Sequence, residues 1–264
     1  MGLCWCSQVD DGMNTNKRGG VVMPTKDIHV NLEIKGCSTA EDVMRYVYDD
    51  IEMPKPGKSH MRVNGVCTSL LYGEILPEGI MKAMDLLGAA HATTLLDVGS
   101  GRGTLAFFAF LCYPNITHTM GVEISDARFN LCAKAMKRIP CARVTKNNVS
   151  IDLTPEPGKH RRLSFYKQNV MKMLDHVRKL SPDIVIFDVE INFGDRTLIG
   201  FLKALKPGCC VLSYEDLSAW WAKSQSVDES IGGFPFTQFG LGITYQTSWA
   251  PNAGYKFMAW RKKR

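Results

Sequence analysis

Three glycines at alternate positions, just after an acidic residue, are the residues of this sequence best suited to holding a ligand. They are Gly99, Gly101 and Gly103, and they follow Asp97. A ligand approaches the backbone closely only where no Cβ atom intervenes, and a sharp turn can demand the positive φ angles that glycine adopts freely. A helix that starts after such a turn presents free N–H groups and a partial positive charge to the ligand. The spacing therefore predicts a binding turn between a strand and a helix.

The flanking residues supply that strand and that helix. Residues 94–98 form an apolar run around the acid, and residues 105–111 are apolar throughout, as in a buried helix. A second apolar strand, residues 119–122, is followed directly by Glu123. A carboxylate at that place can accept hydrogen bonds from both hydroxyls of a ribose. A tight strand-to-helix connection in another kind of α/β domain would have the same local signature, so both interpretations stay open here.

Composition limits the class of protein. A chain of 264 residues with 45% hydrophobic residues is long enough to bury a full core. It has no run of about 18 apolar residues, so we expect no membrane-spanning segment. The nine cysteines are scattered, without paired CxxC units or histidines at ligand spacing, so we expect free thiols and no metal site. The net charge is +6, with basic clusters at 159–162, in an expected loop, and at 261–264. Such clusters are usually solvated surface, but they also suit phosphates or a nuclear address.

Strands and helices are expected to alternate along most of the chain. Residues 1–27 lack periodicity and are expected to be disordered. Residues 28–70 are expected to form a small, mainly helical region, whose helix starts at a capping box formed by Ser38 to Glu41. Pro77 marks the start of a helix that leads into the glycine turn. We expect further helices at 126–138, about 170–179 and 195–205, strands at 163–167, 183–187 and 209–213, and a polar loop at 140–160. Two final strands, 237–249 and 255–260, are expected to flank a turn at 251–254. This order predicts an α/β fold with a doubly wound sheet.

The glycine turn resembles that of class I S-adenosylmethionine-dependent methyltransferases more than the dinucleotide fingerprint, whose third glycine is replaced by Thr104. The resemblance implies S-adenosylmethionine as cofactor, bound by a catalytic domain over residues 71–264. It also implies a Rossmann-like sheet of seven strands, closed by a terminal antiparallel hairpin.

Four further stretches resemble one family, the Dot1-like (disruptor of telomeric silencing) histone H3 lysine methyltransferases. They are the lid sequence 72–74, the loop 186–194, the triplet 247–249 and Tyr255. In its compact length the chain is most similar to the short protozoan members. The resemblance implies a histone H3 N-methyltransferase that acts on a lysine of the nucleosome core, in the nucleus, with DNA-phosphate contacts through the basic clusters.

The resemblance also assigns roles to residues. Trp249 and Tyr255 would form walls of the lysine channel, and Phe193 would shape it next to the reacting atoms. The family usually has Asn where Glu190 aligns, so Glu190 or Asn192 would orient the amine. The expected cofactor-binding residues are Tyr72, Gly73, Glu74, Ile75, Asp97, Gly99, Ser100, Gly101, Gly103, Thr104, Glu123, Asn169 and Val170.

Two rival functions remain at this stage. One is a methyltransferase for nucleic acids, small molecules or other proteins on the same scaffold, although residues 188–191 lack the Asn/Asp-Pro-Pro-aromatic signature of base methylation. The other is a non-catalytic protein that only binds the cofactor. The intact glycine turn argues for cofactor binding but does not demonstrate turnover.

Overall fold

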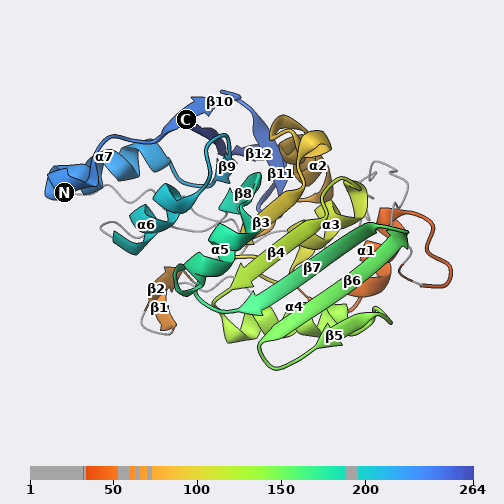
Figure 1. The fold of residues 1–264 in the computed structure, drawn as a ribbon. Helices are drawn as coiled ribbons and strands as arrows, with labels where there is room; N and C mark the ends of the chain where they lie inside the picture. The colour runs from red at the N-terminus through yellow and green to blue at the C-terminus, as the bar shows by residue number, and fades with distance from the viewer. Residues whose placement is uncertain (1–31, 33, 53–59, 64–65, 70–72, 188–195) are drawn as a thin grey trace, which may run out of the picture.

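The chain folds around one central sheet, seen in a computed structural model that describes residues 32, 34–52, 60–63, 66–69, 73–187 and 196–264. Within these residues the sheet has nine strands in the order β10-β13-β9-β8-β3-β4-β7-β6-β5 (Figure 1). Strands β9, β8, β3, β4 and β7 run parallel, and the strands outside them are antiparallel. The expected α/β fold with a mostly parallel sheet is confirmed.

The central elements lie where the sequence predicts them. The strands are β3 (Thr94–Val98), β4 (His118–Glu123), β7 (Lys159–Lys167), β8 (Ile184–Phe187) and β9 (Cys210–Ser213). The helices are α2 (Pro77–Leu86), α3 (Thr104–Cys112), α4 (Asp126–Met136), η2 (Val170–Met173) with α5 (Leu174–Leu180), and α6 (Arg196–Ala204). Helix α7 (Leu217–Val227) and the short η1 (Ala89–His91) and η3 (Glu229–Ile231) were not expected.

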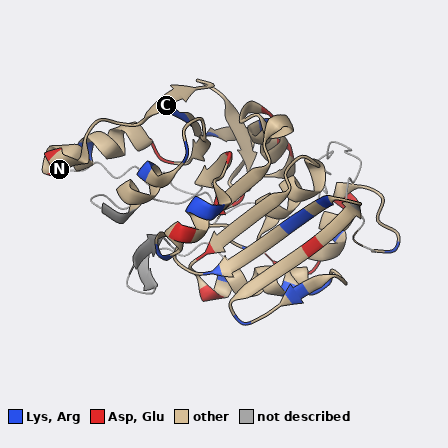
Figure 2. Ribbon diagram, viewed as in Figure 1, with Lys and Arg blue, Asp and Glu red and all other residues tan. Residues whose placement is uncertain are grey.

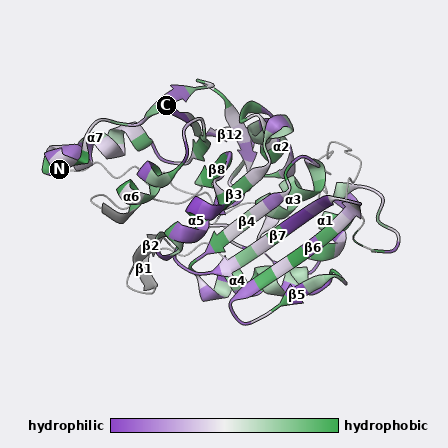
Figure 3. Ribbon diagram, viewed as in Figure 1, coloured by the Kyte–Doolittle hydropathy of each residue, from purple (hydrophilic) through white to green (hydrophobic). Residues whose placement is uncertain are grey.

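The core lies on both faces of the sheet. Helices α2, α3 and α4, with α1 (Ala40–Tyr48), bury apolar side chains on one face, and α5, α6 and α7 bury theirs on the other. Helix α3 is buried from Ala106 to Cys112 because it lies between the sheet and α1 and α2. All four residues of β8 are buried, which explains its continuous β-branched and aromatic sequence (Figure 3).

The expected loop at 140–160 is wrong, because these residues form two further strands. They are β5 (Ala142–Val144) and β6 (Asn148–Glu156), and β6 forms a hairpin with β7. Val149 and Ile151 are buried on one face of β6 and alternate with residues on its other face. This two-residue period is typical of a strand, but the nearby prolines made the segment look like a loop. Gly158, at φ +82°, makes the hairpin turn. These strands account for a sheet wider than the expected seven strands.

The basic cluster at 159–162 therefore lies in a strand and not in a loop (Figure 2). Arg161 is only 2% exposed, and its guanidinium donates hydrogen bonds to the backbone oxygens of Phe110, Tyr113 and Ile116. These carbonyls lie at and just after the C-terminal end of α3, where a helix favours positive charge. Burial lowers the pKa of Arg161 to about 10. Arg161 is therefore a helix-capping residue and not part of the exposed basic surface, whereas DNA contacts by the other residues of the cluster stay a prediction.

The C-terminal part contains four strands where two were expected. Strand β10 (Phe236–Phe239) pairs with β13 (Met258–Lys262) at the edge of the main sheet. Strands β11 (Thr244–Thr247) and β12 (Ala250–Lys256) form a separate hairpin whose turn is Ser248-Trp249. The Pro-Asn-Ala-Gly stretch expected as a turn lies inside β12. The terminal antiparallel hairpin is thus present, but its turn lies earlier in the chain.

The N-terminal region contains the expected helix and a small hairpin. Helix α1 has Thr39 as its N-cap, paired reciprocally with Asp42, so the capping box lies one residue later than expected. Strands β1 (His60–Val63) and β2 (Val66–Ser69) form a two-stranded sheet of their own. The expected disorder of residues 1–27 lies outside the described residues.

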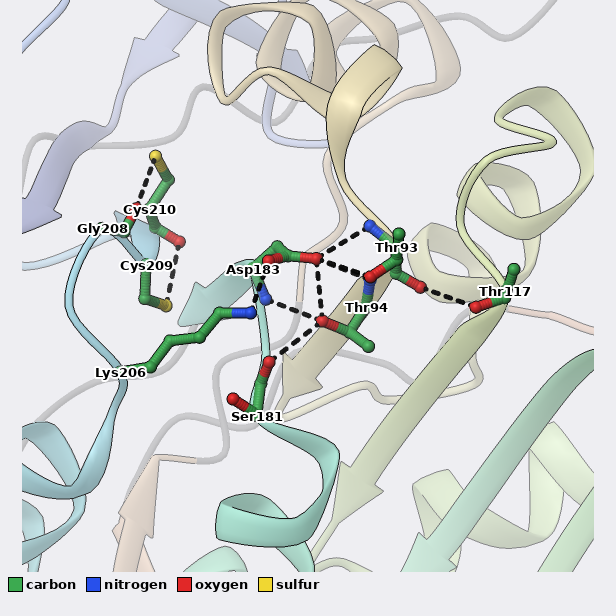
Figure 4. A network of polar contacts seen from close by, with 9 residues as sticks. All are labelled: Thr93, Thr94, Thr117, Ser181, Asp183, Lys206, Gly208, Cys209 and Cys210. Atoms are coloured by element: carbon green, nitrogen blue, oxygen red, sulfur yellow. Dashed lines mark hydrogen bonds and ion pairs between the residues drawn. The ribbon is translucent and has the colours of Figure 1, made fainter.

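A polar network fixes the two central strands at the end of the sheet away from the glycine turn (Figure 4). One carboxylate oxygen of Asp183 accepts hydrogen bonds from the backbone N–H and the hydroxyl of both Thr93 and Thr94, at 2.8 to 3.1 Å. Its other oxygen lies 2.5 Å from the Lys206 ammonium. Burial alone would raise the pKa of Asp183, but these hydrogen bonds lower it to about 2. The network holds the start of β3 beside the start of β8.

Candidate cofactor and acceptor site

The glycine turn has the geometry that its sequence predicts. Gly99, Gly101 and Gly103 have φ angles of 79°, 56° and 87°. Gly103 is the N-cap of α3, and a Cβ atom there would lie 2.8 Å from the Phe165 ring. Both the positive φ angles and the close packing therefore require glycine.

A small cavity of about 30 Å³ brings several of the predicted residues together at the carboxyl end of β3. Its lining contains the lid residues 73–75, Asp97 and part of the turn. The full lining is Gly73, Glu74, Ile75, Asp97, Gly99, Ser100, Gly101, Thr104 and Leu105. All of these except Leu105 were predicted from the sequence to bind the cofactor, although the lid and the turn are far apart along the chain.

Glu123 supports the turn from behind. One of its carboxylate oxygens accepts the Gly101 N–H at 2.8 Å, and the other accepts the Ser125 N–H at 2.7 Å. The residue is 2% exposed, and its pKa is raised, because burial raises it by more than these two N–H groups and the nearby Arg128 lower it. Each carboxylate oxygen has a second lone pair, so the side chain keeps acceptor capacity for a hydroxyl.

Asn169 and Val170 lie at the same edge of the sheet, beyond the end of β7. The last residue of β7, Lys167, pairs with Glu123. The Asn169 side chain accepts the Met171 N–H at 2.9 Å and caps η2, and Val170 is 6% exposed. Neither residue lines the small cavity.

The lid segment is attached to the β11–β12 hairpin. Glu74 donates its N–H to the Ser248 hydroxyl at 3.0 Å and accepts the Ser248 N–H at 2.8 Å. Gly73 packs directly against the Trp249 indole, because a Cβ atom at Gly73 would lie 2.0 Å from the ring. Residues 73 and 74 of the lid and the triplet 247–249 therefore form one structural unit.

Glu74 is also bound to the glycine turn. Its carboxylate forms a bidentate ion pair with Arg102, with distances of 2.7 Å to Nε and 2.9 Å to Nη2. The Thr104 hydroxyl donates to the same carboxylate at 3.1 Å. Sequence reasoning missed Arg102, because its side-chain partners come from segments distant in the chain.

Trp249 and Tyr255 belong to an aromatic cluster. Their ring centroids lie 5.8 Å apart, edge to face. Tyr214, which follows β9, stacks on Tyr255 at 4.9 Å and meets Trp249 at 6.4 Å. Its N–H donates to the Phe187 oxygen at 3.2 Å, which places it at the carboxyl ends of β8 and β9. Sequence reasoning missed Tyr214, although its place directly after a predicted parallel strand was a usable signal.

Four predicted site residues lie outside the described residues: Tyr72, Glu190, Asn192 and Phe193. Within the described part of the chain, no three His, Cys, Asp or Glu side chains lie together as a metal site would need. The helices of that part include none with the length and hydropathy of a membrane span.

Comparison with protein families matches residues 53–255 to the family described as "Histone methylation protein DOT1". Among solved structures, the O-methyltransferase TomG of Streptomyces achromogenes, in complex with SAM, is 13% identical, with a TM-score of 0.45, over 85% of this chain and 89% of that chain. An O-methyltransferase from Bacillus cereus, in complex with SAH, is 10% identical, with a TM-score of 0.44, over 85% of this chain and 90% of that chain. Similarity at such low sequence identity and TM-score does not identify the substrate of this chain. A search of curated proteins found no match.

Proposed function

We propose that this chain, which belongs to the DOT1 histone methylation family, methylates a lysine of histone H3 in the nucleosome core. As a member of that family it is an S-adenosylmethionine-dependent methyltransferase. The choice of lysine, of histone H3 and of the nucleosome is the proposal. One observation supports it most: Gly73 lines the cofactor cavity and also packs on Trp249, so the donor cavity adjoins an aromatic wall.

The residues around the cavity fit S-adenosylmethionine. The ligand carries an ammonium, a carboxylate, a sulfonium and a ribose. We assign the ammonium to Asp97, the carboxylate to the N-terminal end of α3, and the ribose hydroxyls to Glu123. The glycines carry no Cβ atoms, so a ligand can approach the backbone of the turn closely. When bound, the cofactor supplies a methyl group activated by the positively charged sulfur.

The protein must present a neutral amine to that methyl group. A free lysine amine has a pKa of about 10.4, so at pH 7.5 only about one in a thousand is uncharged. An apolar aromatic channel favours the neutral amine by desolvation, and the nearby sulfonium repels the charged form. Once its proton is lost to water, the neutral amine would take the methyl group directly from the sulfonium of the bound cofactor, which would leave as a neutral thioether. We therefore expect no covalent enzyme intermediate.

Trp249 and Tyr255, supported by Tyr214, are proposed to hold the lysine stem. The roles of Phe193 in shaping the channel and of Glu190 or Asn192 in orienting the amine stay predictions. Holding the nitrogen, carbon and sulfur atoms in line can itself lower the barrier by several kcal/mol. The nuclear location and DNA contacts by the exposed basic residues are likewise proposals.

The proposed substrate is tested with radiolabelled S-adenosylmethionine offered to nucleosomes, free histones and RNA, followed by acid hydrolysis of the labelled product. We expect methyl-lysine in histone H3, formed on nucleosomes. Label on RNA alone, or on arginine, contradicts the proposal, and S-adenosylhomocysteine binding without any labelled acceptor favours a binding protein.

A matched pair of variants tests the aromatic wall. Trp249 and Tyr46 are exposed to similar extents, 43% and 47%, but only Trp249 lies beside the cavity. Trp249→Leu is expected to reduce methylation strongly, while Tyr46→Leu leaves it close to the wild-type rate. Equal effects of the two substitutions would contradict the assignment.

A further inference from the structure

We propose that Arg102 is a positioning residue that locks the lid onto the glycine turn and couples cofactor binding to the docking of α1. The proposal rests on the proposed function, because it takes the cavity beneath the lid as the cofactor site. It assigns to Glu74 a role that differs from the one expected from the sequence. Glu74 would act through Arg102 and not as a ligand of the cofactor.

The ion pair between Arg102 and Glu74 has the geometry of a strong contact. Two guanidinium nitrogens meet two carboxylate oxygens, at 2.7 and 2.9 Å, which is the bidentate arrangement that favours arginine over lysine. The two side chains are only 13% and 12% exposed, so solvent and salt screen the pair weakly. Thr104 adds a third donor to the same carboxylate at 3.1 Å. The carboxylate of Glu74 is thus engaged by the turn and by α3.

The backbone of Glu74 is held by a different element. Its N–H and C=O pair with Ser248 in the turn of the β11–β12 hairpin. Glu74 therefore joins the hairpin that carries Trp249 to the glycine turn that carries the cofactor cavity. Breaking the ion pair would free the lid from the turn while its attachment to the hairpin remains.

Arg102 also reaches α1. Its Nη1 donates to the Ile51 oxygen at 2.5 Å, and its guanidinium lies 5.1 Å from the centroid of the Tyr48 ring. The Tyr48 hydroxyl in turn donates to the Arg102 oxygen at 3.1 Å. The Arg102 guanidinium thus contacts both the lid and the end of α1, while the Arg102 backbone is part of the glycine turn. A ligand that stabilises this arrangement must stabilise α1 docking, and by linkage the docked helix must strengthen ligand binding.

A second arginine provides a control for the helix. Arg138 donates to the backbone oxygens of Tyr46 and Val47, at 3.0 and 3.3 Å, and pairs with Asp50. It holds the same end of α1 from the end of α4, through Tyr46, Val47 and Asp50 and not through Glu74. Arg138→Gln should loosen α1 and leave the lid locked.

The test measures S-adenosylhomocysteine binding by calorimetry in the wild-type chain, Arg102→Gln, Glu74→Gln, the double variant and Arg138→Gln. We expect each of the first two substitutions to weaken binding by about tenfold or more. The double variant should bind no more weakly than the weaker single variant, because both substitutions remove the same lock. Arg138→Gln should weaken binding only through the loosening of α1, and so by less than Arg102→Gln, because its lid stays locked to the turn.

Hydrogen exchange of the α1 amides provides the second readout. S-adenosylhomocysteine should slow this exchange in the wild type but not in Arg102→Gln, and Arg102→Gln should speed it without ligand. Arg102→Lys keeps the positive charge but loses the bidentate guanidinium, so its α1 exchange should lie between those of the wild type and Arg102→Gln. This milder variant keeps the test valid if Arg102→Gln does not fold.

Three results would overturn the lock. They are an unchanged affinity in Arg102→Gln, an unchanged α1 exchange in that variant, or multiplicative losses in the double variant, which would make Glu74 a direct ligand. If the wild type binds no S-adenosylhomocysteine, the proposed function fails instead, and the lock is then decided by α1 exchange in ligand-free Arg102→Gln.

Discussion

Adding one methyl group at Gly73 is expected to disable the acceptor side of the site. The new Cβ atom would lie 2.0 Å from Cε3 and 2.1 Å from Cζ3 of Trp249, about 1.4 Å closer than the 3.4 Å at which ordinary contact begins. The lid backbone cannot withdraw easily, because Glu74 is hydrogen-bonded to Ser248 in both directions. The indole is 43% exposed, so we expect it to move outward by more than 1 Å.

The displaced indole loses its edge contacts with Tyr255 at 5.8 Å and Tyr214 at 6.4 Å. Aromatic pairs of this kind contribute about 0.5–1.5 kcal/mol each, so Gly73→Ala should lower the free energy of unfolding by about 1–3 kcal/mol. Catalysis should suffer more, because a misplacement of about 1 Å at a reacting site can cost about a hundredfold. Affinity for S-adenosylhomocysteine should change less, because the added methyl group points at Trp249.

The assay compares kcat/KM for labelled methyl transfer to nucleosomes, S-adenosylhomocysteine binding and thermal unfolding. Gly200→Ala is the control, because it makes the same chemical change in α6, where a Cβ atom meets nothing within 4 Å. Trp249→Leu in the Gly73→Ala background should restore stability without restoring activity. A wild-type kcat/KM in Gly73→Ala would refute the assignment of Trp249 to the lysine channel. Complete loss of S-adenosylhomocysteine binding would refute the view that this substitution affects the acceptor side and spares the cofactor cavity.

Two further predictions concern stability. The pKa of Asp183 in the folded state lies near 2, below its ordinary value of 3.8, so this carboxylate contributes about 2 kcal/mol to stability above pH 4 and loses that contribution as the pH falls toward 2. In denaturant titrations, Asp183→Asn should lower the free energy of unfolding at pH 7 by about that amount and flatten its dependence on pH between 4 and 2. An unchanged pH dependence would contradict the role of the network with Thr93, Thr94 and Lys206. Arg161→Met should cost about 3–5 kcal/mol in the same titrations, because three buried carbonyls at the end of α3 lose their donor, and a cost below about 1 kcal/mol would show that the cap is dispensable.

Local patterns in the sequence were enough for the central elements and the cofactor turn. The run 94–98 became β3 with the same bounds, and Pro77 begins α2. The glycine spacing predicted positive φ angles because no other residue adopts them freely. These features depend on interactions between near neighbours in the chain, so periodicity and turn chemistry report them.

Patterns failed where a neighbouring strand or helix decides the conformation. Residues 148–156 contain a proline and several polar residues, yet they form β6 because β7 lies beside them. Pro251 and Gly254 suggest a turn, yet the whole stretch lies inside β12, whose residues on either side of it pair with β11. Arg161 belongs to a basic run, yet it is buried because the carbonyls of α3 receive it.

The sequence by itself determined the α/β fold, the glycine turn and, through its motifs, the family. It could not determine how the motifs meet, because the contacts join residues that lie between 28 and 176 positions apart in the chain. Only the tertiary structure places Trp249 against Gly73, stacks Tyr214 on Tyr255 and directs Arg102 to both the lid and α1. Side-chain partners of this kind follow from the packing of whole elements, which no local spacing encodes.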